Sequence, residues 1–170
     1  MSAAVAVCPL FSTMPALPFC KPGLGSIINS SASDQIIPGV EIETAALWPD
    51  DRGHFLEILR FGTGRGDAVS TETMQVSCAL SYPGTIKAFH HHSRQTDFWV
   101  PAVGMFQVAL VDIRPSSPSF GAKNTLYIGN LRPWKLVIPP GVAHGYKVIG
   151  STAGVLVYVT NRFYDPADEG

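Results

Sequence analysis

The 170-residue sequence predicts an all-β domain, built as a sandwich or a barrel. From residue 36 onward, short β-rich runs alternate with turn residues at close spacing. The sequence has 16 Gly and 14 Pro but only 15% charged residues, which favours short strands and tight turns over long surface helices. No long segment shows clean helical periodicity. A chain of this length forms one domain with a substantial core.

The expected strands are bounded by turn residues. Residues 40–43 alternate apolar and charged side chains, and a Pro83-Gly84 turn precedes a later run. Gly104 separates two neighbouring runs, and Pro139-Pro140-Gly141 makes a rigid bend after another. The strands expected in chain order are 40–43, 55–59, 74–81, 85–90, 98–103, 105–114, 125–128, 135–138, 145–149 and 155–160.

Residues 1–35 differ from the rest of the chain. They are rich in Ala, Ser, Pro and Gly, and they show no sustained period of 2 or 3.6 residues. We expect an N-terminal tail or arm that either packs on the barrel or on a neighbouring subunit, or stays disordered. The globular domain then covers residues 36–170.

The composition and charge of the chain exclude several kinds of binding partner and cellular location. The formal net charge is −1 and basic residues are scattered singly, so no nucleic acid partner is expected. No apolar run approaches the ~20 residues of a membrane span. The N-terminus has no Lys or Arg before Lys21, unlike a signal peptide. Three cysteines without a repeated spacing indicate reduced thiols, and we therefore expect a cytoplasmic protein.

Four of the five histidines lie in the second half of the chain, at positions 90, 91, 92 and 144. Alternate side chains of a strand share one face, so His90 and His92 point to one side and His91 to the other. Two histidines inside a barrel each need a polar partner, because a buried polar group is costly unless it is satisfied. Residues 84–104 are therefore predicted to build a small-molecule site.

The spacing within this stretch resembles the first cupin motif, in which two His and a Glu bind a metal. Five residues separate Gly84 from His90, and one separates His90 from His92. Four residues then separate His92 from Asp97, which stands in place of the Glu, and six more precede Gly104. The resemblance implies a cupin fold, a double-stranded β-helix or jelly-roll barrel with the site inside.

The segment 139–144, with the pattern Pro-x-Gly-x-x-His, resembles the core of the second cupin motif. That motif brings a third histidine, here His144, to the site. Val148 stands where the motif has Asn. Together the two motifs imply one divalent transition metal as an alternative cofactor, with the ligands His90, His92, Asp97 and His144.

A longer resemblance runs from about residue 36 to residue 170. Residues 51–57 read like D-x-R-G-x-F-x-E, 84–90 like G-V-L-R-G-L-H, 111–114 like V-D-L-R, and 138–146 like I-P-x-G-F-A-H-G-F. These segments resemble the dTDP-4-dehydrorhamnose 3,5-epimerase family, dimeric cupins that work without a metal. The resemblance implies a homodimer whose small-molecule substrate is a sugar nucleotide.

The resemblance also implies roles for individual residues. His90 matches the general base that removes a proton next to a carbonyl, and Tyr158 matches the general acid on the opposite face. An imidazole titrates near 6.5 and a phenol near 10, which suits these two tasks. The substrate-binding residues implied are Arg52 and Lys87 for the phosphates, Glu57 and Gln75 near the nucleotide, and His144 in the same pocket. From their strand positions we also expect His92 and Trp99 to bind the substrate from the pocket wall.

Two departures from the family are visible. Asp97 stands where the family has a Lys that stabilises the enolate oxygen, and a carboxylate would repel that oxygen. We expect Asp97 to orient a histidine instead, as a third catalytic residue. The family also continues beyond Glu169 to an Asp that orients the catalytic His, whereas this sequence stops at Gly170.

Three functions follow from these patterns. The first is acid/base proton transfer without a cofactor, on a keto-sugar nucleotide or on another carbonyl compound such as a polyketide, by epimerisation or ring closure in natural-product biosynthesis. The second is a metal-dependent cupin with the three-His, one-Asp site. The third is a non-catalytic sugar-binding cupin in which His92 and Asp97 simply pair with each other.

Overall fold

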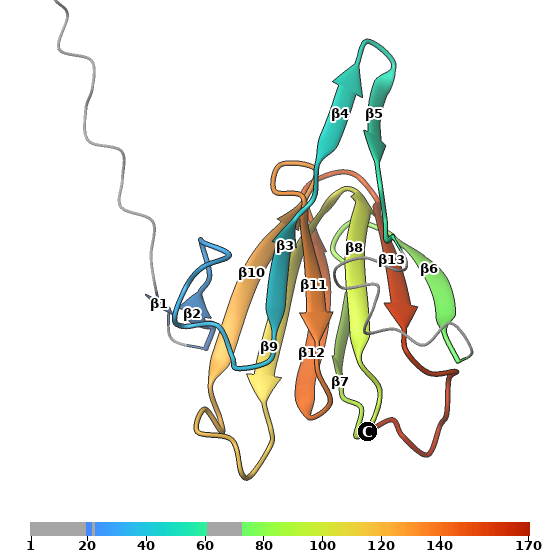
Figure 1. Cartoon of the computed structure of the whole chain (residues 1–170). Coiled ribbons are helices and arrows are strands. Elements are labelled where there is room, and N and C mark those ends of the chain that lie inside the picture. Colours follow the sequence, from blue (N-terminus) through green and yellow to red (C-terminus); the bar gives the residue numbers. More distant parts are fainter. Residues whose placement is uncertain (1–19, 22, 61–72) are drawn as a thin grey trace, which may run out of the picture.

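The computed structural model describes residues 20–21, 23–60 and 73–170, and every regular element in them is a strand (Figure 1). Six strands form one sheet in the order β1-β2-β10-β9-β12-β7, and five form a second sheet in the order β3-β11-β8-β13-β6. The bounds in the first sheet are β1 Cys20–Lys21, β2 Gly25–Ile27, β10 Lys123–Gly129, β9 Met105–Asp112, β12 Val142–Ile149 and β7 Ile86–His90. Those in the second are β3 Glu41–Thr44, β11 Trp134–Ile138, β8 Asp97–Val103, β13 Gly154–Thr160 and β6 Gln75–Ser81.

The core lies between these two sheets. Along β9 the side chains of Phe106, Val108 and Leu110 are fully buried, and the residues between them are half-buried. They pack in one cluster with Leu136 of β11 and Leu156 of β13, from the opposite sheet. Burying each such side chain stabilises the fold by about 1.5–3 kcal/mol. The two-residue period expected from the sequence is thus the period of burial.

The predicted all-β class is confirmed, and most strand positions match with shifted ends. Of the run 55–59, only residues 55 and 56 are in a strand, at the end of β5 (Gly53–Leu56), whereas 125–128 and 145–149 are only parts of the longer β10 and β12. The run 105–114 was predicted too long, because the Asp112 carboxylate accepts the backbone N–H of Arg114 in a tight turn. β4 (Leu47–Asp50) was not predicted, because Pro49 argues against a strand in the sequence. The strand tolerates this proline because it pairs on one side only.

The N-terminal segment contributes two short strands. β2 pairs parallel with β10 at the edge of the first sheet, and β1 pairs with β2. Part of the predicted arm therefore belongs to the sheet, while residues 1–19 and residue 22 lie outside the described residues. Of the three cysteines, Cys78 is a free, exposed thiol. No helix in the described residues is long and apolar enough to cross a membrane.

β4 and β5 form a separate two-stranded hairpin that extends beyond the ends of the two sheets (Figure 1). The rings of Trp48 and Phe55 contact each other across it, with centroids 5.7 Å apart. Both side chains are more than half exposed. The hairpin therefore presents apolar surface away from the core of its own chain.

Candidate active site

A cavity of about 280 Å³ opens between the two sheets, where β7 and β12 face β6, β8 and β13. Strand register sets its walls. In the first sheet His144 pairs opposite His90, and in the second Tyr158 pairs opposite Trp99. Because residues i and i+2 of a strand share a face, Gln75, Ser77 and Ala79 of β6 all reach the same cavity.

The structure brings most of the predicted site residues to this cavity. Seven of them line it: Gln75, Lys87, His90, His92, Asp97, Trp99 and Tyr158. His144 is buried directly behind the wall, with its ring centroid 4.2 Å from that of His90. His91 follows the last residue of β7 and does not line the cavity; its ring lies against Gly170.

Arg52 and Glu57 do not line the cavity. Arg52 lies at the tip of the β4–β5 hairpin, where it is exposed and pairs with Asp50. Glu57 follows β5 and pairs with Arg60. Within one chain, these two residues are not part of the site.

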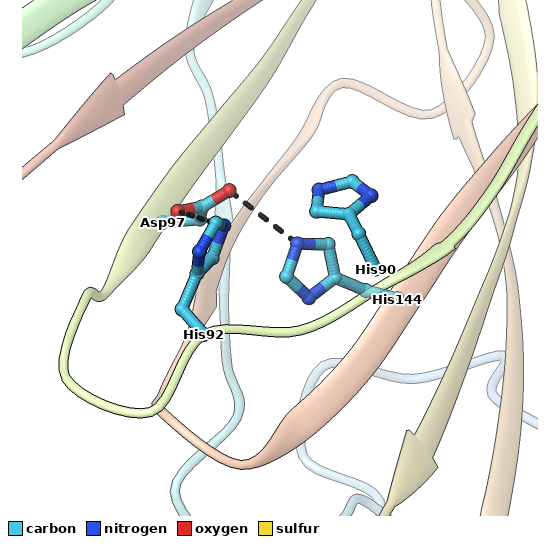
Figure 2. Close-up of side chains that lie close together, drawn as sticks. All are labelled: His90, His92, Asp97 and His144. Carbon is cyan, nitrogen blue, oxygen red and sulfur yellow. Dashed lines mark ion pairs between the residues drawn. The ribbon is translucent and has the colours of Figure 1, made fainter. Parts of the chain in front are cut away.

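Asp97 is the centre of a buried polar network (Figure 2). Its Oδ1 accepts a hydrogen bond from the Gln95 amide at 2.8 Å, and its Oδ2 accepts one from the Trp99 indole at 3.1 Å. Burial opposes ionisation, but the charge that His144 can carry and the Gln95 hydrogen bond hold the pKa of Asp97 below its ordinary value. Asp97 is therefore a carboxylate, as an orienting residue must be.

His90 is half-buried at the cavity wall, with three aromatic rings around it: His92, Trp99 and His144. Burial, helped by the neighbouring His144, lowers the pKa of His90 to about 4. The imidazole is therefore neutral near pH 7 and carries a lone pair, which is the form that accepts a proton.

His144 has a fixed ring orientation. Its Nδ1 lies 2.8 Å from the carbonyl oxygen of Val142, and its Nε2 lies 3.4 Å from Oδ2 of Asp97. His92 Nε2 lies 3.7 Å from the other carboxylate oxygen (Figure 2). The four residues of the metal alternative thus come together, with ligand atoms within 4.8 Å of one another.

The sequence and the fold both match known epimerases. The family model of dTDP-4-dehydrorhamnose 3,5-epimerase matches residues 34–170. The chain belongs to the dTDP-4-dehydrorhamnose 3,5-epimerase family. Members of this family are isomerases, so the all-β barrel described above is an epimerase fold.

Individual relatives support this assignment. The chain is 40% identical over 131 residues to the spore coat polysaccharide biosynthesis protein SpsL of Bacillus subtilis, covering 77% of this chain and 84% of that one. It is 30% identical over 133 residues to a probable low-salt glycan biosynthesis epimerase of Haloferax volcanii, covering 78% and 83%. A dTDP sugar isomerase structure from Desulfovibrio desulfuricans matches with a TM-score of 0.72 at 24% identity, over 79% of this chain and 83% of that chain.

Other residues of this cavity were not predicted from the sequence. Gln95 bridges two site residues, since its amide nitrogen lies 3.1 Å from His92 Nε2 and 2.8 Å from Asp97 Oδ1. Glu169 and Tyr164 close the cavity from the C-terminal segment. Only the position of Gln95 two residues before Asp97 could have suggested it, because the fold alone brings residues 164 and 169 to the cavity.

Proposed function

We propose that the chain is an epimerase that inverts a carbon next to the carbonyl of a nucleotide-linked keto sugar. His90 is the base that removes the proton, and Tyr158 is the acid that returns one from the other side. The observation that carries this proposal is that His90 of β7 and Tyr158 of β13 line one cavity from two opposing sheets.

The chemistry suits the positions of both groups. A neutral imidazole removes the proton α to the carbonyl, which leaves an enolate, and a phenol can protonate that carbon. When the new proton arrives on the face opposite the base, the configuration is inverted. General acid and general base each contribute about 10²- to 10⁴-fold to such a rate.

The size of the cavity limits what it holds. At about 280 Å³ it lies at the lower end of small-ligand pockets, so it accommodates a sugar rather than a whole sugar nucleotide. We propose that the nucleotide extends outward past Lys87 and Gln75, with Lys87 on a phosphate. A Bacillus anthracis structure of similar fold holds TDP and PPi, which supports a nucleotide ligand for this chain as well.

We further propose that the protein is a homodimer. β6 and β7 are edge strands of the two sheets, and they and the turn between them carry apolar side chains that are more than half exposed. These residues are Val76, Leu80, Tyr82, Ile86 and Phe89. A contiguous apolar surface is typical of a protein interface. In such a dimer the hairpin of one copy, with Arg52 and Glu57, can reach the nucleotide of the other.

Solvent exchange tests the proposed reaction. The protein is incubated in D₂O with a dTDP-linked 4-keto-6-deoxy sugar, and the product is analysed by NMR and mass spectrometry. We expect deuterium at a carbon next to the carbonyl, with the inverted sugar as product. Binding of the sugar nucleotide without any exchange would overturn the proposal and favour a sugar-binding protein.

A further inference from the structure

One ring nitrogen of His144 faces the carboxylate of Asp97. In the neutral ring, this nitrogen carries no proton. The other nitrogen, Nδ1, lies 2.8 Å from a backbone carbonyl oxygen, which can only accept, so Nδ1 is the donor. In the neutral ring Nε2 then carries a lone pair. That nitrogen is buried, has no hydrogen-bond partner, and lies 3.4 Å from Oδ2 of Asp97. Two lone pairs that face each other at this distance repel, and either a proton on Nε2 or a metal ion between them removes that repulsion.

Among the described residues, Asp97 has no Lys or Arg partner, and both of its ion-pair partners are histidines. In the part of the chain that the structure describes, its ion pairs are with His92 and His144 only, and its hydrogen bonds come from the neutral Gln95 and Trp99. Asp97 is 3% exposed. A buried carboxylate is costly unless a cation or several donors compensate it.

The spacing of the donor atoms fits a metal ion. A tetrahedral ion with bonds of about 2.0–2.1 Å holds its ligand atoms about 3.4 Å apart. His144 Nε2 lies 3.4 Å from Asp97 Oδ2, and His92 Nε2 lies 3.7 Å from the other oxygen, Oδ1. One ligand atom from each of these residues lies within 4.8 Å of the others, so the ligand atoms are close enough to surround one ion. Outer contacts of the kind that orient metal ligands are also present, since the Val142 carbonyl fixes His144 and the Trp99 indole fixes the carboxylate.

We propose that His92, Asp97 and His144 bind one divalent transition-metal ion at the cavity wall. Imidazole and carboxylate ligands suit Zn²⁺, Fe²⁺, Mn²⁺, Co²⁺ or Ni²⁺. Gln95 holds the ligand atoms of His92 and Asp97 together, and gives up its contact with His92 when the ion binds. The fourth residue of this cluster, His90, is assigned to the substrate in this proposal, because it is only half-buried, whereas His92, Asp97 and His144 are buried.

The ion also has a task in the reaction, and this part rests on the proposed function. Proton removal next to a carbonyl places negative charge on the carbonyl oxygen, and Asp97 alone would repel it. A divalent ion bound to one carboxylate leaves a net charge of +1 at this point. The site thus becomes attractive to the developing charge instead of repulsive.

Metal content tests the site directly. Untagged protein is stripped with a chelator, loaded separately with Mn²⁺, Fe²⁺, Co²⁺ or Zn²⁺, dialysed, and analysed for its elements. We expect about one ion per chain, and a visible absorption band for the Co²⁺ form. Asp97→Asn and His144→Gln should weaken binding by more than the roughly ten- to a hundred-fold seen for outer contacts. The matched controls His91→Gln and His90→Gln should bind the ion as the wild type does.

Thermal unfolding of each metal-free variant shows whether it is folded, so weak binding can be assigned to the lost ligand. A wild-type protein that retains less than about a tenth of an equivalent of every ion would overturn the site, and would indicate a proton between His144 and Asp97 instead. Equal binding by His144→Gln, or loss of the ion from His90→Gln, would also overturn it. Metal binding without solvent exchange would contradict only the proposed function, whereas exchange without metal would contradict only the site.

Discussion

Lys87 is the one Lys or Arg among the described residues that line the cavity, and we propose that it contributes to substrate binding. It lies on β7 three residues before His90 and lines the cavity from the same strand. A hydrogen bond to a charged group contributes about 1.5–3 kcal/mol, and each 1.4 kcal/mol is a tenfold change in affinity. Lys87→Met should therefore raise KM for a dTDP-linked keto sugar by about ten- to a hundred-fold, with a smaller change in kcat.

Steady-state kinetics and direct titration with dTDP measure this effect. Lys147→Met is the matched control, because Lys147 is an exposed lysine of the neighbouring β12 that does not line the cavity. An unchanged KM in Lys87→Met would remove this residue from phosphate binding.

The loop between β7 and β8 is the element that sets the site. The carboxylate of Asp168 accepts the backbone N–H groups of three successive residues in this loop: Ser93, Arg94 and Gln95. Burial opposes ionisation of Asp168, but the Arg94 guanidinium and these N–H groups outweigh it and keep its pKa below the ordinary value. Asp168 thus fixes the segment that carries His92 and Gln95 to the C-terminal end of the chain.

Asp168→Asn should lower the free energy of unfolding by about 1–3 kcal/mol, because loop N–H groups lose their acceptor. An aspartate whose pKa is depressed by folding stabilises the protein above its unfolded value near 3.9, and this contribution disappears as the pH falls through the folded value. The difference between wild type and variant should therefore be constant from about pH 5 to 8 and shrink below about pH 4. Urea unfolding at several pH values measures it.

Asp165→Asn is the control for this element, because Asp165 pairs with Arg94 at the surface and accepts no loop N–H of β7–β8. Exposed ion pairs contribute about 0–1 kcal/mol. Equal destabilisation by the two variants, or a difference that does not depend on pH, would contradict the role of Asp168.

Part of the candidate site could be predicted from the sequence, and part of it could not. Strand alternation and cupin-like spacing located His90, His92 and Asp97, since all three depend on local geometry. Gln95 was missed because its position depends on Asp168, 73 residues further along the chain. Likewise, Arg52 carries a motif of the family, yet a local pattern does not indicate that the hairpin points away from its own cavity.

At the scale of the whole molecule, the exposed apolar side chains of β6 and β7 predict self-association. Leu80 is 61% exposed and lies on the outer face of β6, opposite to the face that lines the cavity. Leu80→Lys places a charge in the proposed interface and should convert the dimer to a monomer, because an unpaired charge in an interface is costly. Light scattering after size-exclusion chromatography measures the mass.

Leu131→Lys is the control for association, because Leu131 is 87% exposed in the turn between β10 and β11. Loss of the dimer should also weaken nucleotide binding if Arg52 of a second copy completes the site. A wild-type protein that is monomeric at micromolar concentration would contradict the interface.

We propose that two opposing sheets supply the two ends of one proton transfer, with His90 on one sheet and Tyr158 on the other. The position and stereochemistry of deuterium incorporation test it most directly, in wild type, His90→Gln and Tyr158→Phe, each first shown to be folded by thermal unfolding. We expect exchange with inversion in the wild type, no exchange in His90→Gln, and exchange with little inversion in Tyr158→Phe. Full exchange in His90→Gln, or full inversion in Tyr158→Phe, would contradict it.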